Sequence, residues 1–212
     1  MTGSLLQRVA DALVSRPWFY ELVQNAAGRS IVVEKMKAVL PDTSPACVFD
    51  IGSSSGGLAR TLGLDPISLD IDPVSVLAMR RQHPASVGVV GDAAELPFSA
   101  SCFDLSLCTF VSHHLPEPAW RRMLSELSRV TRGTLIFIDG LRDETRMVSR
   151  LLWRYDRGRF PRRRDDILSA LGHEFALGHV VDFSIYHRYL LCTATPGSSP
   201  APRPSVTEPS VG

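Results

Sequence analysis

Apolar residues recur at helical spacing over the first 45 positions, and short apolar runs separated by turns replace this pattern from residue 46 onward. Leu5, Val9 and Leu13 share one helical face, and another helix is predicted from Ser30 to Leu40. The chain before the first strand is therefore expected to form a helical cap that covers residues 1–45.

From residue 46 the hydrophobic pattern alternates between short buried runs and amphipathic stretches, which is typical of strand–helix–strand units. Strands are predicted at Cys47–Ile51, Ile67–Ile71, Val87–Val90, Phe103–Phe110 and Thr134–Asp139. Two further runs, Val180–Ile185 and Arg188–Ala194, lie too close together for a helical crossover, so we expect them to form an antiparallel hairpin. The pattern predicts an α/β fold with a seven-stranded, mostly parallel sheet, a C-terminal antiparallel hairpin and helices on both faces.

Two segments depart from this alternation. A long helical stretch from Asp143 to about Leu171 is expected to break near Gly158 and Pro161. Residues 196–212 are rich in Pro and Ser and lack an apolar pattern, so we expect a disordered tail there. The predicted division is a single domain over 1–195, made of the helical cap at 1–45 and a core at 46–195, followed by the tail.

The composition is that of an ordinary globular protein, with 44% hydrophobic and 21% charged residues. The formal net charge of +1 offers no excess of positive charge to nucleic acid, so we expect no nucleic-acid partner. The four cysteines lack metal-ligand spacing, so we expect no metal, and they favour a reducing compartment. Without an apolar run of membrane-spanning length or a secretory leader, the chain is expected to be cytoplasmic and to have no membrane span.

The loop Gly52–Gly57 follows the first strand and opens a helix, and its small residues let the backbone approach a ligand closely. Asp70 ends the second strand, where a carboxylate can accept hydrogen bonds from both hydroxyls of a ribose. Asp92 follows the third strand, where a carboxylate can accept from an adenine amino group. By itself the loop also fits a plain strand-to-helix turn and nearly fits a nicotinamide dinucleotide fingerprint, so both alternatives stay open.

Four segments together resemble the motifs of the class I S-adenosylmethionine-dependent methyltransferases, in particular the small type 11-like members. They are Val48–Gly56, similar to the first cofactor motif, Leu69–Pro73, similar to the ribose motif, Gly91–Phe98, similar to the adenine motif, and Phe103–Leu115, similar to the fourth-strand motif. The resemblance extends from Val48 to Asp139. It implies a Rossmann-like fold and S-adenosyl-L-methionine as the cofactor.

The resemblance also implies a set of cofactor-binding residues, namely Asp50, Gly52, Ser53, Ser54, Gly56, Asp70, Ile71, Asp92, Ala93, Cys108 and Thr109. Ser54 departs from the family pattern, because it replaces the middle glycine of the first motif and takes room beside the methionine part of the cofactor. Its hydroxyl can in turn donate a hydrogen bond. The stretch Arg129–Gly133 lacks the usual turn of the family before the fifth strand, which affects no expected ligand.

His113 and His114 follow the fourth strand, where the substrate site of the family opens. Methyl transfer to a phenol, an alcohol or an acidic carbon needs a base, and histidine titrates near neutral pH. Either histidine is therefore a candidate general base. The alternative is that one histidine packs beneath the cofactor while the other caps the next helix, and the spacing of the two does not decide between these roles.

Arginines recur every four residues in the first half of the segment 142–164 and cluster in its second half. In the family, the stretch between the fifth and sixth strands often caps the substrate site, so Tyr155, Arg157 and Arg159 are candidate substrate-binding residues. Tyr20 of the N-terminal cap is a further candidate. The alternatives are a solvated basic face for the arginines and plain core packing for the N-terminal aromatic residues.

The leading interpretation is a methyltransferase that acts on a small molecule, either a specialised metabolite or a lipid-like or anionic compound. The alternatives are an NAD(P)-dependent oxidoreductase and a non-catalytic S-adenosylmethionine-binding homologue. The short chain after the fifth strand leaves little room for the substrate domain of an oxidoreductase, whereas Ser54 keeps the non-catalytic alternative open. The sequence does not indicate the methyl acceptor, the methylated atom or the oligomeric state.

Overall fold

The computed structural model describes residues 28–54, 56–142, 153, 158–185 and 188–197. The helices predicted before residue 28 lie outside the described residues, as do nearly all of 143–157 and the predicted tail beyond residue 197. Every strand that the sequence predicts falls within the described residues.

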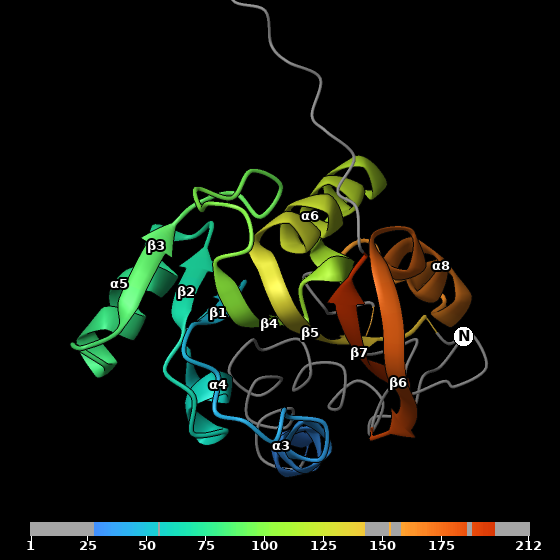
Figure 1. Ribbon diagram of the computed structural model, residues 1–212, viewed down its shortest axis with the longest axis horizontal. Helices are drawn as coiled ribbons and strands as arrows, with labels where there is room; N and C mark the ends of the chain where they lie inside the picture. Colours follow the sequence, from blue (N-terminus) through green and yellow to red (C-terminus); the bar gives the residue numbers. More distant parts are fainter. Residues whose placement is uncertain (1–27, 55, 143–152, 154–157, 186–187, 198–212) are drawn as a thin grey trace, which may run out of the picture.

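One sheet contains the strands in the order β3-β2-β1-β4-β5-β7-β6 (Figure 1). Their bounds are β1 Val48–Ile51, β2 Ile67–Asp70, β3 Val87–Val90, β4 Phe103–Thr109, β5 Thr131–Gly140, β6 Phe175–Ser184 and β7 Arg188–Pro196. Strands β1 to β5 pair in parallel, whereas β7 pairs antiparallel with both β5 and β6. This arrangement confirms the predicted α/β, Rossmann-like fold with its C-terminal antiparallel hairpin.

Helices connect the parallel strands and precede the hairpin. Their bounds are α3 Arg29–Lys37, α4 Gly57–Thr61, α5 Pro73–Gln82, α6 Glu117–Val130 and α8 Arg164–Glu174, with a short 3-10 turn at Ser112–His114. The helix α5 begins after Asp72, because the Asp72 carboxylate accepts hydrogen bonds from Val74 N and Ser75 N. Pro73 then suits the first helical position, where its missing N–H leaves no bond unmade.

Two apolar clusters lie on opposite faces of the sheet. One joins buried residues of α6 and α8 to strand residues that include Phe49 and Phe137. The other joins buried residues of α3 and α4 to strand residues that include Leu105 and Ile136. Successive residues of a strand point to opposite faces, which is why the neighbours Ile136 and Phe137 belong to different clusters. Figure 1 shows the two pairs of helices on the two sides, so both faces are covered as predicted.

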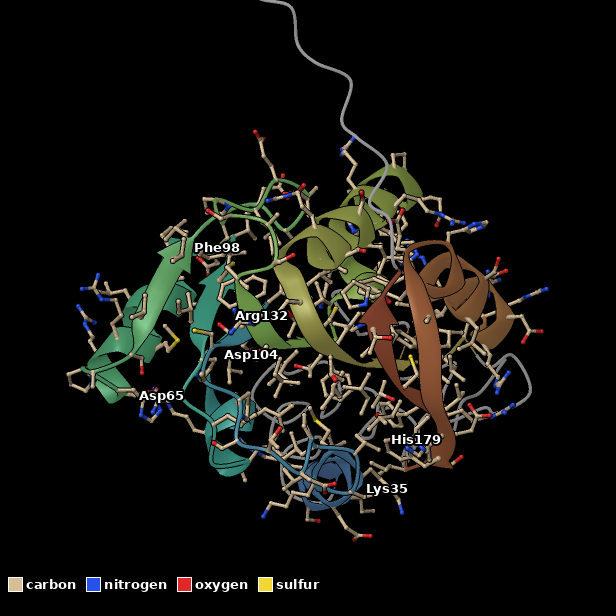
Figure 2. The ribbon with its side chains drawn as sticks, in the orientation of Figure 1. Lys35, Asp65, Phe98, Asp104, Arg132 and His179 are labelled. Carbon is tan, nitrogen blue, oxygen red and sulfur yellow. The ribbon has the colours of Figure 1, made fainter. Side chains whose placement is uncertain are left out.

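An ion pair holds the amino-terminal ends of the central strands together (Figure 2). Asp104 in β4 accepts hydrogen bonds from Cys47 N at 2.9 Å and from Arg132 Nε of β5 at 2.6 Å. The bond from Arg132 holds the pKa of Asp104 below its usual value. These contacts occupy the amino-terminal ends of the parallel strands. Open α/β sheets bind ligands at the carboxyl-terminal ends of their strands, so we expect a ligand at the opposite end of the sheet.

The fifth strand begins earlier than its apolar run predicts, at Thr131 rather than Thr134. Its ladder with β4 shifts register just after the first residue pair. Gly133 lies at this shift, where a Cβ atom would stand 2.1 Å from Asp104 O. A bulge at such a close approach requires glycine, so residues with the composition of a turn belong to the strand.

The C-terminal hairpin is longer than predicted. The strand β6 begins at Phe175 rather than Val180, because Phe175 pairs with Pro196 of β7. The ladder with β7 shifts register between Leu177 and Val180, so Gly178 and His179 interrupt the apolar run of this edge strand and the hydrophobic pattern misses its first half. Gly197 N also donates to Glu174 O at 3.2 Å. Pro196 and Gly197, the first two residues of the predicted tail, are thus bonded to Phe175 and Glu174, and the division into domain and tail stays a prediction.

The predicted helices that lie within the described residues are present, with shifted boundaries. The helix predicted from Ser30 to Leu40 is α3, which ends at Lys37. Residues 158–163 are not helical and α8 begins at Arg164, which confirms the break predicted near Gly158 and Pro161. In the part of the chain that the structure describes, no helix has both the length and the hydrophobicity that crossing a bilayer requires.

Candidate functional site

The loop after β1 is fixed to the carboxyl-terminal end of β2. Gly52 N and Ser53 N both donate to Leu69 O, at 2.7 and 3.2 Å, and Ser54 N donates to Asp70 Oδ2 at 2.8 Å. The order β3-β2-β1-β4-β5 means that the chain progresses in opposite directions on the two sides of the β1–β4 pair. The loop therefore lies at the topological switch point, where open α/β sheets bind ligands.

Backbone conformation explains the small residues of this loop. Gly52 and Gly56 have φ angles of 65° and 71°. A Cβ atom on Gly52 would meet Val111 Cγ2 at 2.5 Å, so only glycine lets the loop lie against the segment after β4. Ser54 also has a positive φ, of 49°, at the position where the family pattern has glycine. Because its side chain is exposed, backbone strain is the main cost of serine here.

Asp70 ends β2 and braces the loop. Its Oδ2 accepts from Ser54 N at 2.8 Å and its Oδ1 accepts from Asp72 N at 2.9 Å. A carboxylate has about four lone-pair sites, so each oxygen retains capacity for one more donor. This geometry suits the predicted ribose contact, in which two hydroxyls would donate to the same carboxylate.

Asp50 lies at the centre of the site, in β1, with only 3% of its surface exposed. Its Oδ1 has no hydrogen-bond partner among the described residues, and the same holds for Ser53 Oγ in the adjoining loop. Burial, together with the nearby negative charge of Asp70, raises the pKa of Asp50 to about 7. A buried carboxylate oxygen without a hydrogen-bond donor is stabilised by a proton or by a bound cation. The site therefore favours a positively charged group beside Asp50.

The segment after β3 faces solvent at the same edge. Asp92 is exposed, and its Oδ1 accepts from Ala94 N at 2.8 Å, which forms a local turn. Ala93 beside it is half-buried. Ile71, just after β2, is 71% exposed, which is unusual for an isoleucine and fits a residue that a ligand covers. The predicted contacts of these three residues with the cofactor remain predictions.

Two of the predicted cofactor-binding residues lie at the end of β4. Cys108 is completely buried in the apolar cluster that contains α6, and burial raises the pKa of its thiol well above the usual value. Thr109, the last residue of the strand, is half-buried and pairs with Ile138 of β5. The exposed end of the strand is therefore formed by Thr109, while the Cys108 side chain belongs to the core.

A buried histidine–carboxylate pair lies on the other side of the switch point. His113 Nδ1 is 2.6 Å from Asp139 Oδ1, although the two residues are separated by 26 positions in the chain. Ser112 Oγ donates to Asp139 Oδ2 at 2.5 Å, and Gly140 N donates to Asp139 Oδ1 at 2.7 Å. His113 is 6% exposed and Asp139 is fully buried, so solvent does not loosen this network.

The donors around Asp139 keep it ionised. Burial alone would raise the pKa of Asp139, but the positive charge that His113 can carry and the hydrogen bonds from His113, Ser112 and Gly140 lower it below its usual value. An ionised Asp139 accepts from His113 and thereby places the ring proton on Nδ1. The basic nitrogen of that tautomer is Nε2, as in other carboxylate–histidine pairs.

The two adjacent histidines differ in their surroundings. His114 is exposed, and its ring centroid lies 4.2 Å from that of His113. Trp153 contacts His113 edge to face at 5.4 Å, and its indole Nε1 donates to Leu141 O at 3.3 Å. Of the two candidate bases, His113 is thus the one with a buried carboxylate and an aromatic neighbour.

The structure describes only one of the four predicted substrate-binding residues, and their roles stay predictions. Tyr20, Tyr155 and Arg157 lie outside the described residues, and Arg159 is exposed. The residues that sequence reasoning missed are Asp139, which orients His113, and Arg162, which is buried. Asp139 ends a strand, as Asp70 does, and that position was a signal that could have identified it. No sequence signal separated Arg162 from its neighbouring arginines.

Comparisons with known proteins agree with this geometry. A family model described as a methyltransferase domain matches residues 49–137. A demethylmenaquinone methyltransferase of Paenarthrobacter aurescens (strain TC1) is 30% identical over 118 residues, which are 55% of this chain and 46% of that protein. The chain thus spans about half the length of the curated relatives that it matches.

Solved structures share the fold at low sequence identity. The PH0226 protein of Pyrococcus horikoshii OT3 has a TM-score of 0.69 and 16% identity, with 86% of this chain and 100% of that chain covered. The N-methyltransferase NodS of Bradyrhizobium japonicum WM9, in complex with S-adenosyl-L-homocysteine, has a TM-score of 0.67 and 14% identity, with 89% and 97% covered. These likenesses show a common architecture.

Proposed function

We propose that this chain, whose residues 49–137 match the model of a methyltransferase domain, is a class I S-adenosylmethionine-dependent methyltransferase that transfers a methyl group to a small-molecule acceptor and releases S-adenosylhomocysteine. One observation carries the proposal: a loop braced by Asp70 and a buried His113–Asp139 pair flank the switch point of the same sheet. The first feature suits the binding of an adenosine-containing cofactor, and the second suits the removal of a proton.

The residues at the switch point fit S-adenosylmethionine. The unpartnered oxygen of Asp50 and the unpartnered hydroxyl of Ser53 supply acceptors for the ammonium of its methionine part. Asp70 has capacity for the ribose hydroxyls, and Asp92 and Ala93 lie at the strand end where adenine is expected. When bound, the cofactor supplies an electrophilic methyl group on a sulfonium. The reactivity of this group comes from the cofactor rather than from a protein side chain.

His113 takes the acceptor proton in this mechanism. The hydrogen bond to Asp139 holds the ring in one orientation and leaves Nε2 as the basic atom. The proton of the acceptor oxygen, nitrogen or acidic carbon would pass to Nε2, and the ionised Asp139 would stabilise the resulting imidazolium. His114 is exposed and lies beside this pair, so we assign the base to His113 rather than to His114.

The acceptor is proposed to be a specialised metabolite or a lipid-like or anionic compound that must lose a proton on methylation. One relative is named for demethylmenaquinone, so this compound belongs in the set of acceptors to be tested. Phenols, alcohols and fatty acids complete the set, because the first two need a base and a carboxylate needs none. A preference for the first two classes would support a role for His113.

Binding and turnover test the proposal separately. Calorimetry should detect binding of S-adenosylmethionine and S-adenosylhomocysteine but not of NADH, which excludes an oxidoreductase. Release of S-adenosylhomocysteine with the acceptor set then distinguishes an enzyme from a non-catalytic homologue. Binding of NADH, or cofactor binding without turnover of any acceptor, would contradict the proposed activity.

The role of His113 has its own test. Replacing it with alanine should lower kcat about 10²–10⁴-fold, the usual contribution of a positioned base, with little change in cofactor affinity. His114→Ala serves as the matched control and should retain most of the activity. Full activity of His113→Ala toward a phenolic acceptor would remove His113 from the mechanism.

A further inference from the structure

A buried arginine lies outside the machinery described above. Arg162, in the non-helical segment before α8, is only 8% exposed, and no other lysine or arginine within the described residues is buried. Its guanidinium stacks over the ring of Trp120 at 5.0 Å from the ring centroid, and burial lowers its pKa despite the opposing effect of Glu117. Burying a cation costs free energy, so its retention at this place calls for contacts that a neutral side chain cannot make.

These contacts go to the turn that carries His113. Arg162 Nη1 donates to Ser112 O, and Nη2 donates to Leu115 O at 2.7 Å. The two carbonyls flank His113 on both sides in the chain. The planar guanidinium has donors in a fixed fork, so it can hold two carbonyl groups at a set separation, which the single ammonium of lysine cannot do. Arg162 therefore closes the turn from Ser112 to Leu115.

The backbone around Arg162 adds two further ties. Phe160 N donates to His113 O at 2.9 Å, and Arg142 N donates to Arg162 O at 2.8 Å. Leu141 and Arg162 also form a parallel bridge, two residues beyond Asp139. The segment 158–162 thus binds both the turn that holds His113 and the end of β5 that holds Asp139. Three chain segments that are distant in sequence meet at the histidine–carboxylate pair.

We propose that Arg162 is a positioning residue for methyl transfer, which acts by fixing the Ser112–Leu115 turn and so the alignment of His113 with Asp139 and with the acceptor. The proposal rests on the proposed function of His113 as the base. Catalytic groups must be held within about 0.5 Å of their productive geometry, and a displacement of about 1 Å can cost on the order of 100-fold in rate. A turn released from Arg162 would allow displacements of that size.

The principal test compares Arg162→Met with Arg163→Met. Methionine has a similar length without charge or donors, and Arg163 is the exposed neighbour of Arg162. Arg162→Met should lower kcat by about 10–100-fold and leave the Kd of S-adenosylhomocysteine within about twofold of the wild-type value, whereas Arg163→Met should change neither. A merely structural role would instead lower thermal stability and cofactor affinity together while leaving kcat of the folded fraction intact, and that outcome would overturn the proposal.

A double-variant cycle asks whether Arg162 acts through His113. In the His113→Ala background, Arg162→Met should cause no further loss of kcat, because the group that it positions is already absent. Losses that multiply in the double variant would show that the two residues act independently, which contradicts the proposal. Arg162→Lys keeps the buried charge but not the fork and should have an intermediate kcat. If Arg162→Met does not fold, Arg162→Lys replaces it in the comparison with Arg163→Met and in the double-variant cycle. A kcat of Arg162→Lys equal to that of the wild type would then overturn the proposal.

A spectroscopic readout separates this proposal from the proposed function. The Nδ1 proton of His113, protected by its bond to Asp139, should give a proton resonance that is absent in His113→Gln and broadened or lost in Arg162→Met. The measurement needs no acceptor. If the resonance changes while no acceptor is methylated, the proposed activity fails and the positioning by Arg162 stands. If the resonance and kcat of Arg162→Met both match the wild type, the positioning fails and the methyltransferase assignment stands.

Discussion

Single backbone positions set the shape of the loop after β1. Gly52 and Gly63 both have positive φ angles, of 65° and 80°. They differ in surroundings, because a Cβ on Gly52 would meet Val111 Cγ2 at 2.5 Å, whereas nothing lies within 4 Å of a Cβ on Gly63. A comparison of substitutions at the two glycines therefore separates the effect of backbone strain from that of a steric clash at the switch point.

Gly52→Ala should destabilise the protein more than Gly63→Ala does. Both variants incur the strain of a left-handed alanine, about 1–2 kcal/mol, and Gly52→Ala adds a clash that pushes the loop away from the segment after β4. Denaturant unfolding gives the two free energies, and calorimetry with S-adenosylhomocysteine should show lost affinity only for Gly52→Ala. Equal effects of the two substitutions would mean that the contact with Val111 does not shape the site.

The acids at the end of β2 have different tasks despite their proximity. Asp70→Ala removes the acceptor for Ser54 N and for the expected ribose hydroxyls, so S-adenosylhomocysteine affinity should fall by about 1.5–3 kcal/mol. Asp72→Ala removes the cap of α5 and should lower the thermal stability with little effect on affinity. Calorimetry and thermal melts on both variants check this division. Unchanged affinity in a folded Asp70→Ala variant would rule out the ribose contact.

At the scale of elements, α6 ties the segment after β3 to the body of the fold. Glu126 of α6 is 6% exposed, and its Oε2 accepts from Leu96 N at 2.9 Å and from Arg129 Nη2 at 2.7 Å. Arg129 Nη1 donates to Phe98 O at 2.7 Å. This network holds the stretch that follows Asp92, so it contributes to the shape of the part of the site where we propose that adenine binds.

Two ion pairs on the same helix allow a matched comparison. Glu126→Ala leaves Arg129 and Leu96 N without their buried acceptor, which should cost about 3–5 kcal/mol. The pair Glu117–Arg121 has the helical i,i+4 spacing but is largely exposed, so Arg121→Ala should cost only about 0.3–0.5 kcal/mol. Urea unfolding measures both losses. A loss for Glu126→Ala as small as that for Arg121→Ala would show that the network does not hold the segment.

At the scale of the whole molecule, the acidic groups change the stability of the fold with pH in two opposite directions. Hydrogen bonds lower the pKa of Asp72 and of Asp104. Burial would raise the pKa of Asp139, but the positive charge that His113 can carry and the hydrogen bonds to the carboxylate lower it. These three groups therefore contribute stability that is lost as the pH falls through their folded pKa values. The contribution of Asp50 to stability has the opposite pH dependence. Its pKa rises from 3.8 to about 7 on folding, so its contribution is present at low pH and is lost as the pH rises toward 7.

The ligand-free protein should therefore lose stability between about pH 5 and pH 7 through Asp50, by at most about 1.4 kcal/mol per pH unit. The measurement is the Tm of the wild type and of Asp50→Asn across this range, since the difference between the two curves removes the contribution of the histidines. The Tm of the wild type minus the Tm of Asp50→Asn should fall, or become negative, as the pH rises. Parallel curves would mean that the pKa of Asp50 is not raised in the folded protein.

The sequence by itself predicted the elements and the family that the core resembles. The apolar runs that form β1 to β4, the spacing that forbids a crossover between β6 and β7, and the position of Asp70 at a strand end are all local features. Local features follow from the two-residue and 3.6-residue periods of the backbone, so they can be identified without knowledge of the fold. The boundaries of β5 and β6 escaped this reasoning because a bulge and an exposed edge depend on the neighbouring strand.

Only the tertiary structure decided which of these residues lie together. His113 and His114 are equivalent in the sequence, and the choice between them came from Asp139, which β5 brings to His113 from 26 positions away. Arg162 was one arginine among many, and its burial against Ser112, 50 positions earlier, distinguishes it. Such pairings depend on strand order and on the packing of connecting segments, which arise from long-range burial rather than from local periodicity, so a pattern along the chain cannot contain them.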